Sequence, residues 1–137
     1  SLIPCPYTPE EIEAELGITV SPGEASDVEL QPTGRDVGCI YTKVGGSTEV
    51  VIRQVWDPGS NSNAASAMTV KNGRPVPGDP DGAETTRGGG RDGGHRVELH
   101  YHRGRVQVLL AVDGRSFTED DMEPKIVRLR RVPPNHP

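Results

Sequence analysis

The sequence predicts an α+β domain, an antiparallel sheet built from two β-hairpins with short helices packed on one side. Two segments that alternate polar and apolar residues each contain a glycine turn, as hairpins do. Short segments with helix signals flank them, in the order helix, hairpin, helix, loop, hairpin, helix. This order favours one antiparallel sheet with the helices on one face. With 137 residues, the chain is expected to form a single domain over 1–137.

The first predicted element is a short helix in "YTPEEIEAELGI". Thr8 can cap its start, and Glu11 completes a capping box three residues later. Ile12 and Leu16 fall on one face of the helix, which should pack on the core. Gly17 can take the left-handed conformation that ends it.

The first predicted hairpin is "GCIYTKVGGSTEVVIRQVW", which turns at Gly45-Gly46. A two-residue turn there pairs Cys39 with Ile52, so that Cys39 lies on the apolar face of the hairpin. Two weaker elements flank it, a short strand at 27–31 and a short helix at 60–70.

A long loop is predicted at 71–95, where "KNGRPVPGDPDGAETTRGGGRDGGH" is rich in Gly and Pro. We expect no regular core element there, and long loops on rigid scaffolds often carry function. Five of its charged side chains are the predicted partner-binding residues, namely Arg74, Asp79, Asp81, Arg87 and Arg91.

The second predicted hairpin is "HRVELHYHRGRVQVLLAVDG", with its turn at Arg103-Gly104. Glu98, His100 and His102 then share one face of a strand, at a spacing that can chelate zinc. The same register pairs His102 with Arg105, and a cation beside these side chains opposes a divalent metal. The opposite face is uniformly apolar, so the histidines are expected on the outer face of a structural strand, without a metal.

The last predicted element is a helix that starts in "SFTEDDMEPKIVRLRRV", where Thr118 can cap it. Pro124 leaves two alternatives open. Either a kinked helix continues, or a short turn leads into a strand at 125–132.

Composition and motifs exclude several classes of function. A net charge of −5, with seven acidic residues and no Lys or Arg in residues 1–34, argues against nucleic-acid binding. The apolar runs are too short to span a membrane. The chain contains no G-x-S-x-G, H-E-x-x-H or P-loop motif, and "GGGRDG" lacks the strand and helix that a dinucleotide site requires. We therefore expect no enzyme activity and no cofactor.

Two cysteines, Cys5 and Cys39, leave open a disulfide or two buried free thiols. "PCPYTPEEIEAELG", followed 34 residues after its cysteine by "GCIYTKV", resembles a family of secreted lipoprotein domains from high-GC Gram-positive bacteria. The resemblance covers residues 4–45, although Tyr41 stands where tryptophan is usual. It implies a small α+β domain with a Cys5–Cys39 disulfide, an extracytoplasmic location, a possible lipid anchor in the precursor and no catalytic residues.

These observations favour a non-catalytic secreted or cell-envelope domain that binds a protein or small-molecule partner. Binding is expected to use the 71–95 loop together with the adjacent sheet edge or the helix-free face. An alternative is a periplasmic immunity or inhibitor protein, an acidic domain whose Gly-rich loop would block the basic cleft of a toxin or enzyme. A third hypothesis is a metal-dependent hydrolase that uses Glu98, His100 and His102.

Overall fold

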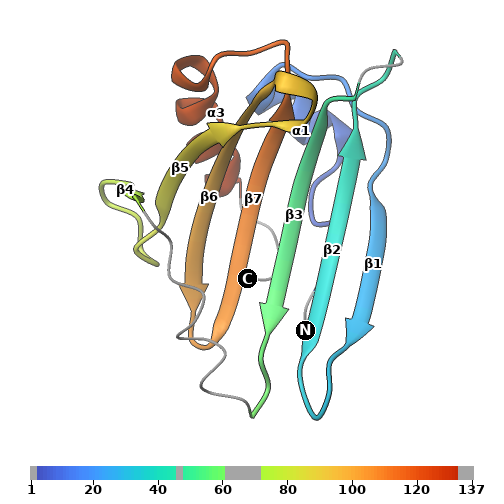
Figure 1. The fold of residues 1–137 in the computed structure, drawn as a ribbon, viewed down its shortest axis with the longest axis vertical. Helices are drawn as coiled ribbons and strands as arrows, with labels where there is room; N and C mark the ends of the chain where they lie inside the picture. The colour runs from blue at the N-terminus through green and yellow to red at the C-terminus, as the bar shows by residue number, and fades with distance from the viewer. Residues whose placement is uncertain (1–2, 46–47, 61–71, 133–137) are drawn as a thin grey trace.

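The computed structural model describes residues 3–45, 48–60 and 72–132, which form a seven-stranded antiparallel sheet with two α-helices on one face (Figure 1). The α+β prediction is confirmed. The strands lie in the order β1-β2-β3-β7-β6-β5-β4. In chain order, the elements are α1 (Pro9–Leu16), β1 (Glu24–Glu29), β2 (Arg35–Thr42), β3 (Val50–Asp57), β4 (Arg74–Pro75), β5 (Glu84–Gly89), the 3-10 turn η1 (Arg91–Gly93), β6 (His95–Arg103), β7 (Val106–Gly114) and α3 (Glu119–Arg131).

The sheet consists of two meanders, β1-β2-β3 and β4-β5-β6-β7, which meet where β3 pairs with β7. The two expected hairpins, β2–β3 and β6–β7, occupy the middle of this sheet. The two-hairpin description is therefore incomplete, because β1 extends the sheet on one side and β5 and β4 extend it on the other. The helix expected at 60–70 falls almost entirely outside the described residues.

Both helices pack on the same face of the sheet, and the core lies between the two layers (Figure 1). Helix α1 starts and ends as predicted. The Thr8 hydroxyl accepts a hydrogen bond from the Glu11 N–H at 3.1 Å, and Gly17 ends the helix with a φ of 72°. The buried side chains from both layers include Ile12, Leu16, Val37, Tyr41, Val51, Val55, Val97, Leu99, Tyr101, Val108, Leu110, Val112, Met122, Ile126 and Leu129.

The register of the β2–β3 hairpin differs by one residue from the prediction. Cys39 pairs with Arg53 rather than with Ile52. Gly46 of the predicted turn lies outside the described residues, but the Lys43 N–H bonds the Glu49 carbonyl at 3.0 Å, so the connection is longer than the predicted two residues. A one-residue shift moves every side chain of one strand to the other face. Arg53 therefore lies on the helix-covered face, where it is buried, and Ile52 lies on the opposite face.

The β6–β7 hairpin differs from the prediction by two residues, which leaves the faces unchanged. His102 pairs with Gln107 instead of Arg105, and the turn is Gly104-Arg105. Gly104 supplies the positive φ of 63° that this turn requires. Because the shift is even, the prediction that the histidines lie on the outer face is correct.

The segment predicted as a loop at 71–95 contains β4, β5 and η1 among its described residues. Strand β5 pairs with β6 along six residues, so the expectation of no regular element is wrong. β5 has few apolar residues because polar contacts replace them on its helix-covered side. There, Thr85 is buried and Arg87 reaches α3.

The alternatives at 125–132 resolve as a helix, since α3 runs through Pro124 to Arg131. Thr118 caps it by accepting a hydrogen bond from the Asp121 N–H at 3.1 Å. Pro124 lies in the second turn of α3, where its missing N–H removes one hydrogen bond to the preceding turn, and the helix continues beyond it.

Candidate functional site

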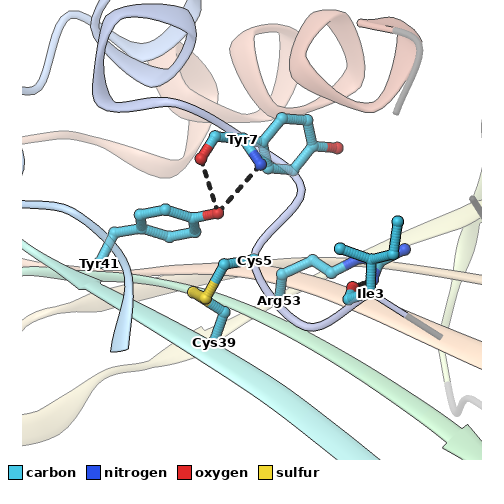
Figure 2. Close-up of a disulfide and its surroundings, with 6 residues drawn as sticks. All are labelled: Ile3, Cys5, Tyr7, Cys39, Tyr41 and Arg53. Atoms are coloured by element: carbon cyan, nitrogen blue, oxygen red, sulfur yellow. Dashed lines mark hydrogen bonds between the residues drawn. A yellow bond between two sulfur atoms is a disulfide. The ribbon is translucent and has the colours of Figure 1, made fainter. Parts of the chain in front are cut away.

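The predicted disulfide between Cys5 and Cys39 is present, and it fastens residues 3–7 across the helix-covered face of β2 and β3 (Figure 2). The buried Tyr41 hydroxyl accepts a hydrogen bond from the Tyr7 N–H and donates one to the Tyr7 carbonyl, both at 3.0 Å. Arg53 Nη1 donates to the Ile3 carbonyl at 2.8 Å. The disulfide and these hydrogen bonds hold the segment to the sheet.

Arg53 lies in the core beside tyrosine rings rather than in an open site. Burial lowers its pKa, and the neighbouring Tyr101 and Tyr7 oppose that change. Burial also raises the pKa of both Tyr7 and Tyr41, so neither phenol ionises at neutral pH. The cluster is closed to solvent by the residue 3–7 segment, and its contacts are those of a structural anchor.

The candidate metal ligands Glu98, His100 and His102 do not converge on one point. Glu98 Oε1 lies 3.1 Å from His100 Nε2, while His102 is exposed at the turn end of β6. Arg96 Nε lies 2.5 Å from Glu98 Oε2. The hydrogen bonds from His100 and then Arg96 lower the pKa of Glu98 to about 2, although burial opposes the shift.

The cation beside these side chains is therefore Arg96, not the predicted Arg105, which instead contacts Asp57 at 3.1 Å. Within residues 3–45, 48–60 and 72–132, no three His, Cys, Asp or Glu side chains gather in an arrangement that could hold a metal ion.

The five predicted partner-binding residues do not form one surface, and each contacts another part of the chain. Arg87 pairs with Glu123 at 3.0 Å and with Asp120 at 2.5 Å, and Arg74 pairs with Glu123 at 3.3 Å. These contacts fasten β4 and β5 to the first turns of α3. The hydrogen bond from Arg87 is the largest influence on Glu123 and lowers its pKa.

Asp79 and Asp81 fasten the turn between β4 and β5 to the far end of α3. Arg130 lies 3.4 Å from Asp79, also contacts Asp81, and stacks on the Tyr101 ring at 3.9 Å from its centroid. Burial opposes ionisation of Asp81, but hydrogen bonds from Arg103 and Arg130 outweigh it and lower its pKa.

Arg91, the fifth of these residues, lies at the other end of the segment. Its side chain donates to the Thr48 carbonyl at 3.3 Å, and its N–H donates to Asp113 at 3.1 Å. The five predicted residues therefore make contacts within the chain at three separate places, two of them on α3 and one beside Thr48 and Asp113.

The face of the sheet opposite the helices, one of the expected binding surfaces, carries a hollow whose residues the sequence did not indicate. No described helix covers this face (Figure 1), and its apolar side chains include Val28 and Ile40, which are 54% and 46% exposed. The hollow has a volume of about 430 Å³. Its lining comes from three adjacent strands: Glu24, Ala25, Ser26, Val28, Asp36, Gly38, Cys39, Ile40, Ile52 and Gln54.

Gly38 creates this hollow, because it is the open-face residue in the middle of β2 and has no side chain. A Cβ atom there would lie only 3.1 Å from the Ser26 hydroxyl. One wall is fixed by a hydrogen bond from the Gln54 amide to the Asp36 carboxylate at 3.0 Å. A glycine inside a strand is the sequence signal that marks such a site.

The residues that line the hollow indicate which chemical groups it can bind. Glu24 and Asp36 contribute carboxylates, Ser26 and Gln54 contribute neutral hydrogen-bonding groups, and Val28, Ile40 and Ile52 contribute apolar surface. The lining contains no Lys, Arg or His and no Ser paired with a base. A cationic group on an apolar stem matches this combination.

Comparisons with known proteins found no matching family model, no similar curated protein and no similar solved structure. The resemblance to secreted lipoprotein domains therefore stays a prediction from residues 4–45. In the described part of the chain, neither helix has the length and apolar character needed to cross a membrane.

Proposed function

We propose that this chain is a non-catalytic secreted or cell-envelope domain that binds a partner on the helix-free face of its sheet. The hollow over Gly38 is the observation on which this proposal rests. It combines exposed apolar side chains with two carboxylates on a face that no described helix covers. Apolar surface exposed beside oriented polar groups is typical of binding sites.

Two other parts of the described molecule are already occupied by contacts within the chain. The helix-covered face is filled by the core and by the residue 3–7 segment, and Arg74 of β4 and Arg87 of β5 are paired with α3. The inhibitor alternative relied on a free Gly-rich loop, and strand pairing fixes much of that segment. The hydrolase alternative required Glu98, His100 and His102 together, and His102 lies apart.

The extracytoplasmic location is supported by the disulfide, because such bonds persist mainly in oxidising compartments. The bridge also suits a chain with few large core residues, in which aromatics make up only 4% of the sequence.

Capture of partners from an envelope extract of the source organism tests the proposal. Gly38→Leu fills the hollow. Gly88→Leu is the matched control, because it adds the same side chain to the same face on β5, where nothing lies within 4 Å of the new Cβ. A partner captured by the wild type and by Gly88→Leu, but lost from Gly38→Leu, is the expected result. Equal capture by both variants, or no specific capture at all, would contradict open-face binding.

A further inference from the structure

Strand β1 ends the sheet on the side next to the hollow, and its backbone is available for pairing. All six of its residues are exposed. The Leu30 N–H bonds the Gly34 carbonyl at 3.1 Å, which fixes the alternation along the β1–β2 ladder. In an antiparallel pair, every second residue directs its N–H and C=O away from the neighbouring strand. The backbone groups of Ala25, Asp27 and Glu29 therefore point outward from the sheet edge.

A shallow channel leads from this edge to the hollow. Ser26 pairs with Gly38, and Gly38 pairs with Gln54, so these residues form one row across the open face. The row begins with the small side chain of Ser26 and continues with Gly38, which has no side chain. Val28 and Asp36 form the next row on one side, and Glu24 and Ile40 form the row on the other. A long side chain entering at Ser26 would thus run between two walls and end beside Asp36.

The charge of this sheet edge indicates which kind of strand could pair with β1. Glu24, Asp27 and Glu29 lie on β1, and Asp36 lies at the hollow. Arg35 contacts Asp27 at 2.7 Å, which leaves the edge with a net negative charge. A second copy pairing through β1 would place these carboxylates against each other, which is unfavourable. A basic strand would place opposite charges together.

We propose that β1 accepts an extended segment of a protein partner as an added strand, with a Lys or Arg side chain that lies across Ser26 and Gly38 toward Asp36. An added strand would lie about 4.8 Å beyond β1, so two strand spacings separate its backbone from Gly38. The added strand pairs with β1 through backbone hydrogen bonds to Ala25, Asp27 and Glu29. The channel accounts for the preference for a basic side chain. The inference rests on the proposed function and names its class of partner.

The test uses the whole chain and a fluorescein-labelled, capped heptapeptide of alternating Thr and Lys, with a Thr/Glu heptapeptide as comparison. Ala25→Pro removes one outward N–H without affecting the bonds to β2, and Ala25→Val keeps that N–H as its control. Asp36→Asn removes the carboxylate charge, and Asp121→Asn on α3 is its control. Binding is measured by fluorescence anisotropy at constant ionic strength, and backbone amide NMR maps the contact and checks folding.

We expect the Lys peptide to bind and to shift the amides of β1 and β2, while the Glu peptide does not bind. Ala25→Pro, Gly38→Leu and Asp36→Asn should each weaken binding by about tenfold or more, and the Ala25→Val, Gly88→Leu and Asp121→Asn controls should retain it. No binding of the Lys peptide up to about 1 mM, or equal binding to Ala25→Pro, overturns strand addition.

Two further outcomes separate this inference from the proposed function. A partner lost from Gly38→Leu but fully captured by Ala25→Pro would retain open-face binding and refute strand addition. Sedimentation that shows a dimer of the wild type but a monomer of Ala25→Pro would identify a second copy as the occupant and refute a basic partner.

Discussion

Removal of the Cys5–Cys39 disulfide is expected to lower the free energy of unfolding by about 4 kcal/mol. The two cysteines are 34 positions apart, so the bridge closes a loop of that length in the unfolded chain. In the chain-entropy relation, such a loop removes about 13 cal/mol/K from the unfolded state, which is about 4 kcal/mol near room temperature. Cys5→Ser with Cys39→Ala is the appropriate double variant, because Cys39 is 1% exposed and alanine leaves no buried polar group there.

Urea unfolding of the wild type and the double variant measures the effect. The midpoint should fall, and the slope of free energy against urea should increase because the uncrosslinked unfolded chain exposes more surface. The thermal midpoint should fall by roughly 10–20 °C. Reduced and alkylated wild type is the control for the substitutions themselves. A loss below about 1 kcal/mol would refute the argument and show that the hydrogen bonds of Tyr7, Tyr41 and Arg53 hold the segment nearly as well alone.

Tyr41→Phe should cost about 1–3 kcal/mol in urea unfolding of the oxidised protein, because the buried N–H and C=O of Tyr7 both lose their partner; an unchanged midpoint would contradict this. Glu98→Gln should be less stable than the wild type above pH 4.5, the ordinary pKa of that group, and the difference should vanish as the pH falls toward 2, because the pKa of Glu98 is lowered in the folded state. A stability difference that does not change with pH would show that the lowered pKa of Glu98 is not its cause. Arg130→Met should speed amide hydrogen exchange at Asp81 and Ala83 while exchange in α1 stays unchanged, since Arg130 fastens this turn to α3. If both amides exchange at the same rate in Arg130→Met as in the wild type, the turn is held by its own hydrogen bonds.

Local signals predicted the starts of α1 and α3 and the faces of the β6–β7 hairpin, because these depend on neighbours in the sequence. Thr8 with Glu11 and Thr118 with Asp121 are short-range capping pairs, and both occur. The apolar alternation of β6 identified its buried face even though its register was two residues off. Such patterns specify which side of a strand is buried more securely than which residue it pairs with.

The Gly/Pro-rich segment was predicted incorrectly because β5 gains its stability from distant residues. Its backbone completes the ladder of β6, and Arg87 on β5 pairs with Glu123, which lies 36 residues later in the chain. Composition alone assigns Gly88 and Gly89 to a loop, yet they end a strand in open space where no side chain is needed. The candidate site was missed for the same reason, since its walls come from three strands.

The acidic hollow exists because of the one-residue difference in the β2–β3 register. A two-residue turn at Gly45-Gly46 would pair Gly38 with Arg53, which would place a guanidinium beside Asp36 on the open face. The longer connection pairs Gly38 with Gln54 instead and turns Arg53 into the core, where it bonds the Ile3 carbonyl. The same shift thus supplies an anchor for the disulfide-bonded segment and leaves the carboxylates of the hollow without a neighbouring cation on β3. We infer the preference for a basic partner from this register, because Asp36 then faces a neutral amide rather than a guanidinium.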